Sequence, residues 1–198
     1  MSIMLGIIFA IVWFFFLHVM RQAKLKAWKF IWGSCGLFVL MMIFIRPYFT
    51  EPLAKVVASI TGVFGSLTGM YSSFFKYGVI FVDSSSGSIS LLIDFECSGI
   101  LEIMAFVALL AFYDVYTVYE RILLGLVGTA YIILANALRI FIICTIIYFN
   151  GISAYSFAHT IVGRVVFYGL SVILYFIVFT KGHIRRQKVG NFTYGVDK

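Results

Sequence analysis

Long apolar runs separated by short polar intervals dominate the chain. A bilayer core of about 30 Å is crossed by about 20 residues at a helical rise of about 1.5 Å per residue, and somewhat shorter runs reach across when aromatic residues flank them. Five runs predict membrane-crossing helices, at residues 3–20, 30–45, 99–113, 122–149 and 160–180. The fourth is longer than one perpendicular crossing needs, so we expect it to tilt, bend or protrude.

Two segments between the runs have different patterns. Apolar positions in residues 53–67 recur at helical spacing opposite polar ones, and Thr50, Glu51 and Pro52 have the residue types of a helix start. We expect an amphipathic helix in the outer interface, with a re-entrant segment or a packing helix as alternatives. Residues 78–82 and 89–95 are rich in β-branched and aromatic side chains around a serine-rich turn, which predicts a small β-hairpin outside the membrane.

Composition supports a membrane protein. Hydrophobic residues make up 63% of the 198 residues, charged residues 12%, and the mean hydropathy is +1.06. This is too apolar for one water-soluble core. We therefore predict an all-α polytopic membrane protein, with residues 1–198 as a single domain.

The net charge of +7 resides largely in two basic clusters beside apolar runs, where Lys and Arg determine topology. We expect both clusters in the cytoplasm of a multi-pass plasma-membrane protein, with the N-terminus outside, the tail 181–198 inside, and no nucleic-acid partner. The clusters comprise Arg21, Lys24, Lys26 and Lys29, and then Lys181, His183, Arg185, Arg186 and Lys188.

This topology places Cys97, Arg139 and His159 together at the outer face, each near a helix end. Of the other thiols, Cys35 falls in the inner half of its helix and Cys144 has no adjacent polar motif. A thiol attacks as its thiolate, a histidine exchanges protons near neutral pH, and an arginine holds a thiolate or an oxyanion. The pattern therefore makes Cys97 a candidate nucleophile that faces outwards. From residue types alone the alternative is structural: a packing cysteine, a histidine that anchors the interface, and an arginine that pairs with an acid.

Glu96 complicates this prediction, because a neighbouring carboxylate raises the pKa of a thiol. It must point elsewhere, orient the imidazole of His159, or contact a cation of the substrate. A metal site formed by Cys97, Glu96 and His159 is a weaker interpretation, since three mixed ligands without a spacing pattern seldom fix a metal. We expect no metal and no cofactor.

Three short blocks resemble the signatures of the exosortase/archaeosortase family, in the family's order. They are Cys97-Ser98-Gly99, the stretch 136–140 from Asn136 to Ile140 with Arg139 inside it, and His159 followed by Gly163. The resemblance covers about residues 65–180, and the small size is similar to the compact Gram-positive, exosortase G-like branch.

The resemblance implies a membrane-embedded cysteine transpeptidase that cleaves C-terminal sorting signals of secreted proteins. Such signals comprise a short motif, a transmembrane helix and a basic tail. Cys97 would form a thioester, Arg139 would stabilise the thiolate or oxyanion, His159 would move the proton, and an acceptor at the membrane lipid surface would release the product. The alternative is a non-enzymatic carrier or export scaffold with a polar intramembrane pathway.

Glu102 departs from the family pattern, because it places a carboxylate inside the third apolar run. Such a group is costly unless it is paired. Arg164 follows His159 by five residues, as Glu102 follows Cys97, so the two should lie at similar depth. We expect an ion pair between Glu102 and Arg164; the alternative is that Arg164 extends to the surface and Glu102 stays neutral.

Overall fold

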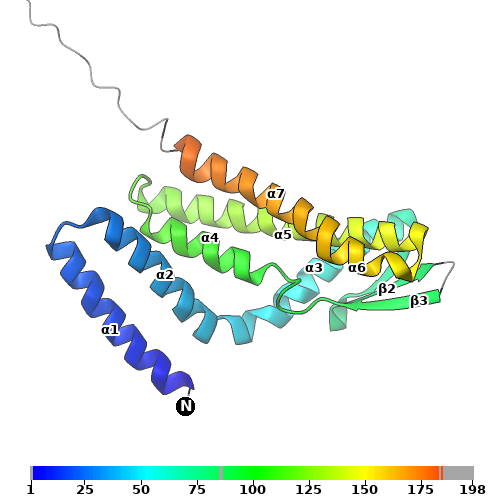
Figure 1. The fold of residues 1–198 in the computed structure, drawn as a ribbon, viewed down its shortest axis with the longest axis horizontal. Helices are drawn as coiled ribbons and strands as arrows, with labels where there is room; N and C mark the ends of the chain where they lie inside the picture. The colour runs from blue at the N-terminus through cyan, green and yellow to red at the C-terminus, as the bar shows by residue number, and fades with distance from the viewer. Residues whose placement is uncertain (1, 85–86, 183, 185–198) are drawn as a thin grey trace, which may run out of the picture.

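Helix α5 (Val118–Asn150) is the central element of the molecule. The computed structural model describes residues 2–84, 87–182 and 184. α5 packs against α3, α4, α7 and β2 in an elongated bundle that has a small sheet at one end (Figure 1). The remaining elements are α1 (Ser2–Gln22), α2 (Lys26–Phe44), α3 (Arg46–Thr68), β1 (Tyr71–Phe74), η1 (Phe75–Tyr77), β2 (Val79–Ser84), β3 (Gly87–Leu92), α4 (Ile100–Phe112), η2 (Ile152–Ala154), α6 (Tyr155–Phe157), η3 (Ala158–Val162), α7 (Gly163–Tyr175) and η4 (Phe176–Lys181).

Three helical segments of the described chain are long and apolar enough to cross a membrane, namely Lys26–Phe44, Val118–Asn150 and Ile152–Lys181. Two shorter apolar helices, Gly6–Gln22 and Ile100–Phe112, coincide with the remaining predicted runs. The fold class of an all-α polytopic membrane protein is therefore confirmed, while the five crossings and their orientation stay predictions.

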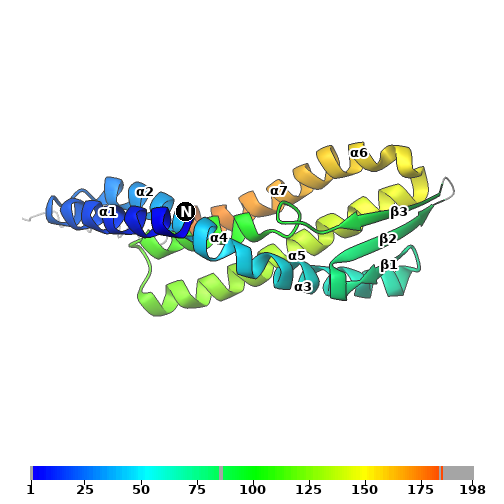
Figure 2. The same ribbon diagram turned by 90° about the horizontal axis from the view of Figure 1, so that it is seen from below.

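The predicted β-hairpin is present as β2 and β3, and it belongs to a three-stranded antiparallel sheet of order β1-β2-β3 (Figure 2). β1 was not predicted. Ile80 and Val82 on β2 are fully buried in one apolar cluster with residues of α3 and α5. This cluster fixes the sheet on the bundle, and the chain leaves β3 for the turn that precedes α4.

The predicted start of the amphipathic helix was wrong. α3 begins at Arg46 directly after α2, with Pro47 in its first turn, whereas Pro52 lies inside the helix. A proline is tolerated in the first turn because its missing N–H has no partner there. The buried face of α3 consists largely of small side chains, at Ala54, Val57, Ala58, Thr61 and Gly65.

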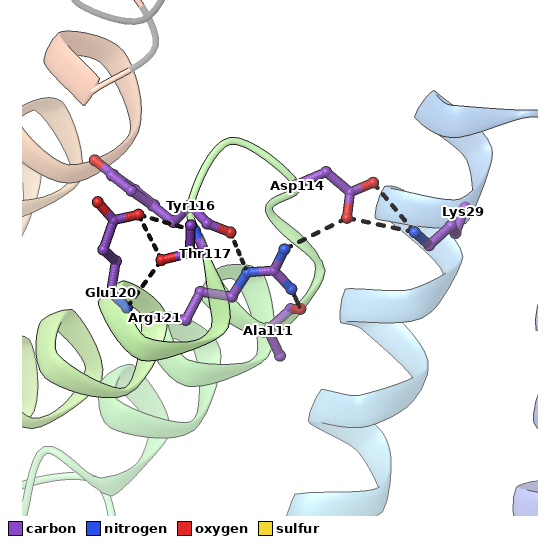
Figure 3. A network of polar contacts seen from close by, with 7 residues as sticks. All are labelled: Lys29, Ala111, Asp114, Tyr116, Thr117, Glu120 and Arg121. Carbon is purple, nitrogen blue, oxygen red and sulfur yellow. Dashed lines mark hydrogen bonds and ion pairs between the residues drawn. The ribbon is translucent and has the colours of Figure 1, made fainter.

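A network of polar contacts holds the connection between α4 and α5 (Figure 3). Asp114 forms ion pairs with Lys29 of α2, at 3.1 Å, and with Arg121 of α5, at 3.6 Å. The Arg121 guanidinium also donates to the backbone carbonyls of Tyr116, at 3.0 Å, and Ala111, at 2.8 Å. Three helices are thus joined at this end of the bundle.

The same connection caps α5. Thr117 and Glu120 form a capping box, in which each side chain accepts a hydrogen bond from the backbone of the other residue. The cap explains why α5 begins at Val118 rather than at the predicted residue 122.

The first basic cluster lies around the turn between α1 and α2. In the second cluster, Lys181 ends η4, whereas His183, Arg185, Arg186 and Lys188 lie outside the described residues.

Candidate active site

A short turn between β3 and α4 holds the backbone of Cys97. The Asp94 carboxylate oxygen Oδ1 accepts hydrogen bonds from the backbone N–H groups of Glu96, at 3.1 Å, and Cys97, at 3.0 Å. Gly99 then adopts φ +80° at the start of α4, a conformation that glycine adopts without steric cost. The cysteine therefore sits in a turn fixed by its own sequence neighbours.

Asn136 ties this turn to α5. Its side-chain Nδ2 donates to the Cys97 carbonyl oxygen at 2.6 Å, and the residue is fully buried. Asn136 also lies against Gly99, where a β-carbon on the glycine would approach the amide nitrogen to 3.5 Å. The sequence predicted Asn136 only as a supporting residue, and the structure gives it this definite contact.

His159, in η3, contacts the Cys97 side chain. Its ring nitrogen Nε2 lies 3.2 Å from the Cys97 Sγ atom, which is hydrogen-bonding distance for sulfur. The ring stacks on Tyr155, with centroids 5.5 Å apart and planes 24° apart. A β-carbon at Gly163 would lie 2.7 Å from the Ile143 side chain, so this glycine permits close packing on α5 one turn after the histidine.

Arg139 is the third member of this group and is 6% exposed. It follows Asn136 by three residues on α5, so both side chains leave the same side of the helix. The guanidinium carbon lies 5.6 Å from the Phe167 ring centroid, and Nε has no hydrogen-bond partner among the described residues. A buried cation with an unused donor is available for a negative charge that develops nearby.

Two small cavities meet at these residues. The first, of about 210 Å³, is lined by β3 and Tyr155, and the second, of about 180 Å³, is lined by residues of α4 and α7. Cys97, Arg139 and His159 line both cavities and are the residues common to them. The thiol can therefore be approached from two sides.

The environment of Cys97 disfavours its thiolate. Burial raises the pKa of the thiol from 9.0 to about 11; Asp94 and Glu96 raise it further, and the Arg139 charge opposes them. The resting group at neutral pH is thus a neutral thiol beside an imidazole. Activation requires transfer of the thiol proton.

Glu96 is exposed and lines the second cavity. The hydrogen bonds of the described residues include its backbone N–H but not its carboxylate. The carboxylate is therefore available to groups that enter this cavity. The sequence analysis gave Asp94 no role. Its carboxylate stabilises the turn by accepting hydrogen bonds from the N–H groups two and three residues later in the chain.

The expected ion pair between Glu102 and Arg164 is not among the ion pairs of the described residues, which join Lys29 to Asp114, Lys55 to Glu51 and Arg121 to Asp114. The predicted contact was therefore wrong, although both side chains line the second cavity. Arg164 is exposed, whereas the Glu102 Oε2 atom is buried without a hydrogen-bond partner. Helices α4 and α7 thus place both side chains on the same cavity, but the two side chains do not form an ion pair.

A mixed metal site is not supported by the arrangement of side chains. Within residues 2–84, 87–182 and 184, no three His, Cys, Asp or Glu side chains form a group that could hold a metal ion.

Comparison with known proteins gave one match. The sequence model of the family described as transmembrane exosortase matches residues 1–177, which is most of the chain. The comparisons with curated proteins and with solved structures found no match.

Proposed function

Because the chain belongs to the transmembrane exosortase family, we propose that it is a membrane-embedded cysteine transpeptidase that cleaves C-terminal sorting signals of secreted proteins. The observation that carries the proposal is the 3.2 Å contact between Cys97 Sγ and His159 Nε2, beside the buried guanidinium of Arg139.

The first half-reaction forms a thioester. His159 takes the Cys97 proton as the sulfur attacks the carbonyl carbon of the scissile peptide bond. The carbonyl oxygen gains the negative charge, and the Arg139 guanidinium stabilises it. The C–N bond then breaks, His159 returns the proton to the leaving amine, and the C-terminal helix and tail of the substrate depart.

The second half-reaction reverses these roles. An acceptor with an amine or hydroxyl group loses its proton to His159 and attacks the thioester carbonyl. The C–S bond breaks, and the sulfur recovers the proton. Water in place of the acceptor would give hydrolysis, so the acceptor decides between anchoring and release.

The two cavities suit a substrate that passes the nucleophile. We place the extended segment before the scissile bond in the first cavity, beside β3, and the chain after that bond in the second cavity, between α4 and α7. Glu96 lines the second cavity and could contact a cationic group of the substrate there.

The test compares surface proteins from cells that carry the wild-type protein or Cys97→Ala. We expect at least one surface protein to keep its C-terminal helix and tail in Cys97→Ala cells, seen as a higher mass and loss of its normal anchoring. Cys35→Ala is the matched control, because Cys35 is an exposed thiol on α2 away from the site. The proposal fails if no protein differs between wild type and Cys97→Ala.

One observation favours a second candidate, a carrier with a polar pathway. Glu102, Arg139 and Arg164 line the same cavity within an otherwise apolar bundle. A carrier should tolerate Cys97→Ser and fail with Glu102→Gln, whereas a transpeptidase should fail with Cys97→Ser and keep most of its activity with Glu102→Gln. The amount and the C-terminal processing of the surface proteins, compared in cells with either variant, separate the two functions.

A further inference from the structure

The outer edge of β3 has backbone groups that no neighbouring strand uses. β3 is the last strand of the sheet, and the hydrogen bond from Ile93 N to Gly78 O, at 2.9 Å, sets the alternation of the ladder. In an antiparallel pair, bonded and non-bonded residue pairs alternate. The N–H and C=O groups of Ser88, Ser90 and Leu92 therefore point away from β2.

Part of this edge faces the candidate nucleophile. Ser90 and Leu92 line the first cavity together with Cys97 and His159, whereas Ser88 does not. In the ladder with β2 these two residues occupy non-bonded pairs, and the other hydrogen bonds of the described residues do not involve their backbone groups. Figure 2 shows β3 at the side of the sheet next to α6, which leads directly into η3. The open edge and His159 of η3 therefore lie on the same cavity.

An unpaired strand edge is a template for an extended peptide, which supplies the complementary N–H and C=O groups. A peptide bond that a thiol attacks must also be held in an exposed, extended chain. The cavity thus combines a strand edge that can hold such a chain with the thiol that would cleave it.

We propose that the substrate segment just before the scissile bond binds as a fourth strand on the outer edge of β3. This inference rests on the proposed transpeptidase function and adds the mode of recognition. Backbone pairing supplies affinity and fixes the register of the substrate on β3. The register then decides which peptide bond of the substrate lies at the Cys97 sulfur.

The direction of the added strand follows from the chain path. β3 runs from the hairpin tip towards the turn before α4, which carries Cys97. With the sheet on the outer side of the membrane, as the sequence predicts, a secreted protein with a C-terminal membrane helix would enter in the same direction. The added strand is therefore parallel to β3. In parallel pairing, a substrate residue opposite Leu91 donates its N–H to the Ser90 carbonyl and accepts from the Leu92 N–H.

The first test removes one outward N–H group. Ser90→Pro deletes the donor without breaking the β2 ladder, because proline is tolerated on the free side of an edge strand. With the surface protein identified by Cys97→Ala, and at equal amounts of membrane protein, we expect about three- to tenfold slower processing, as for one lost hydrogen bond. Ser88→Pro, on the same edge but outside the cavity, should process at the wild-type rate.

Ser90→Ala removes the serine hydroxyl but keeps the backbone N–H, so it measures the effect of the side chain alone. The proposal requires processing with Ser90→Pro to be at least about threefold slower than with Ser90→Ala. Equal rates for the proline variants at 88 and 90 would overturn the proposal.

The second test leaves the enzyme intact, so it does not depend on how Ser90→Pro folds. Proline is placed at each of the residues before the scissile bond of the substrate. In an added strand only every second N–H faces β3. We expect processing to fall at alternate positions over about four residues, and a uniform response would overturn strand pairing.

These outcomes distinguish the two levels of the argument. If Cys97→Ala leaves every C-terminal tail processed, the proposed function fails and the strand inference fails with it. If Cys97→Ala blocks processing but neither proline series shows the expected pattern, strand pairing alone is wrong.

Discussion

The Cys97 thiol should be nearly inert at neutral pH until a substrate arrives. Burial raises the pKa of the thiol to about 11, against an ordinary value of 9.0. A raised pKa means that the thiolate is lost as the pH falls below about 11, so the nucleophilic form is scarce throughout the physiological range.

The size of the effect follows from this shift. A difference of about two pH units makes the thiolate fraction at neutral pH about 100-fold lower than that of an ordinary cysteine. A more basic thiolate is also more nucleophilic, with a Brønsted slope of about 0.4 to 0.5, which recovers about six- to tenfold. Alkylation of Cys97 should therefore be about 10- to 16-fold slower than that of an ordinary thiol at the same pH.

The assay treats the purified protein in detergent with iodoacetamide between pH 7 and 10 and follows the Cys97 peptide by mass spectrometry. We expect the rate to rise about tenfold per pH unit without a plateau. His159→Ala should change this resting rate little, because the neutral imidazole does not ionise the thiol in the free protein. A plateau with a midpoint below about pH 8, lost in His159→Ala, would refute the reasoning, since it would reveal a preformed thiolate–imidazolium pair.

Two further predictions concern the scaffold of the site, and thermal unfolding in detergent measures both. Asn136→Ala should lower the free energy of unfolding by about 1–3 kcal/mol, because it removes a fully buried side chain and leaves the half-buried Cys97 carbonyl without its donor. Asn136→Asp should cost more, since a carboxylate oxygen would face that carbonyl, and a change under about 0.5 kcal/mol in both variants would contradict this. Gly128→Ala should lower the free energy of unfolding by about 1–3 kcal/mol, because the new methyl group would overlap the Phe106 ring on α4. Gly169→Ala has open space and should raise it by about 0.5–1 kcal/mol through helix propensity. Equal melting temperatures of the two variants would argue against this packing of α4 on α5.

The helices and the approximate place of the site could be predicted because their signals are local. Each signal can be recognised from neighbouring residues alone. This holds for the continuous apolar runs, the serine-rich turn and the three short blocks. Topology then brought Cys97, Arg139 and His159 to one end of the bundle, and the structure places all three around two shared cavities.

The remaining features depend on contacts between distant segments. β1 (Tyr71–Phe74) has no alternating apolar pattern, and it is a strand because it pairs with β2. The hydrogen bond from Asn136 to Cys97 joins residues 39 positions apart, which no local pattern encodes. The shared spacing of Glu102 after Cys97 and of Arg164 after His159 could be read from the sequence, but the side-chain separation across a cavity could not.

Unpaired polar atoms point to the same site independently of the sequence motifs. Buried side-chain nitrogen and oxygen atoms nearly always have hydrogen-bond partners, so each exception calls for a reason. Four such atoms occur among the described residues, and three belong to Asn136, Arg139 and Glu102, the fourth being on Thr61. Asn136 touches the Cys97 backbone, and Arg139 and Glu102 line the second cavity. Under the proposed function, a site that receives a peptide carbonyl and then stabilises its oxyanion needs unused donors before the substrate binds. The Arg139 Nε–H group is such a donor. A purely apolar packing role for this region would not explain why this buried group has no hydrogen-bond partner.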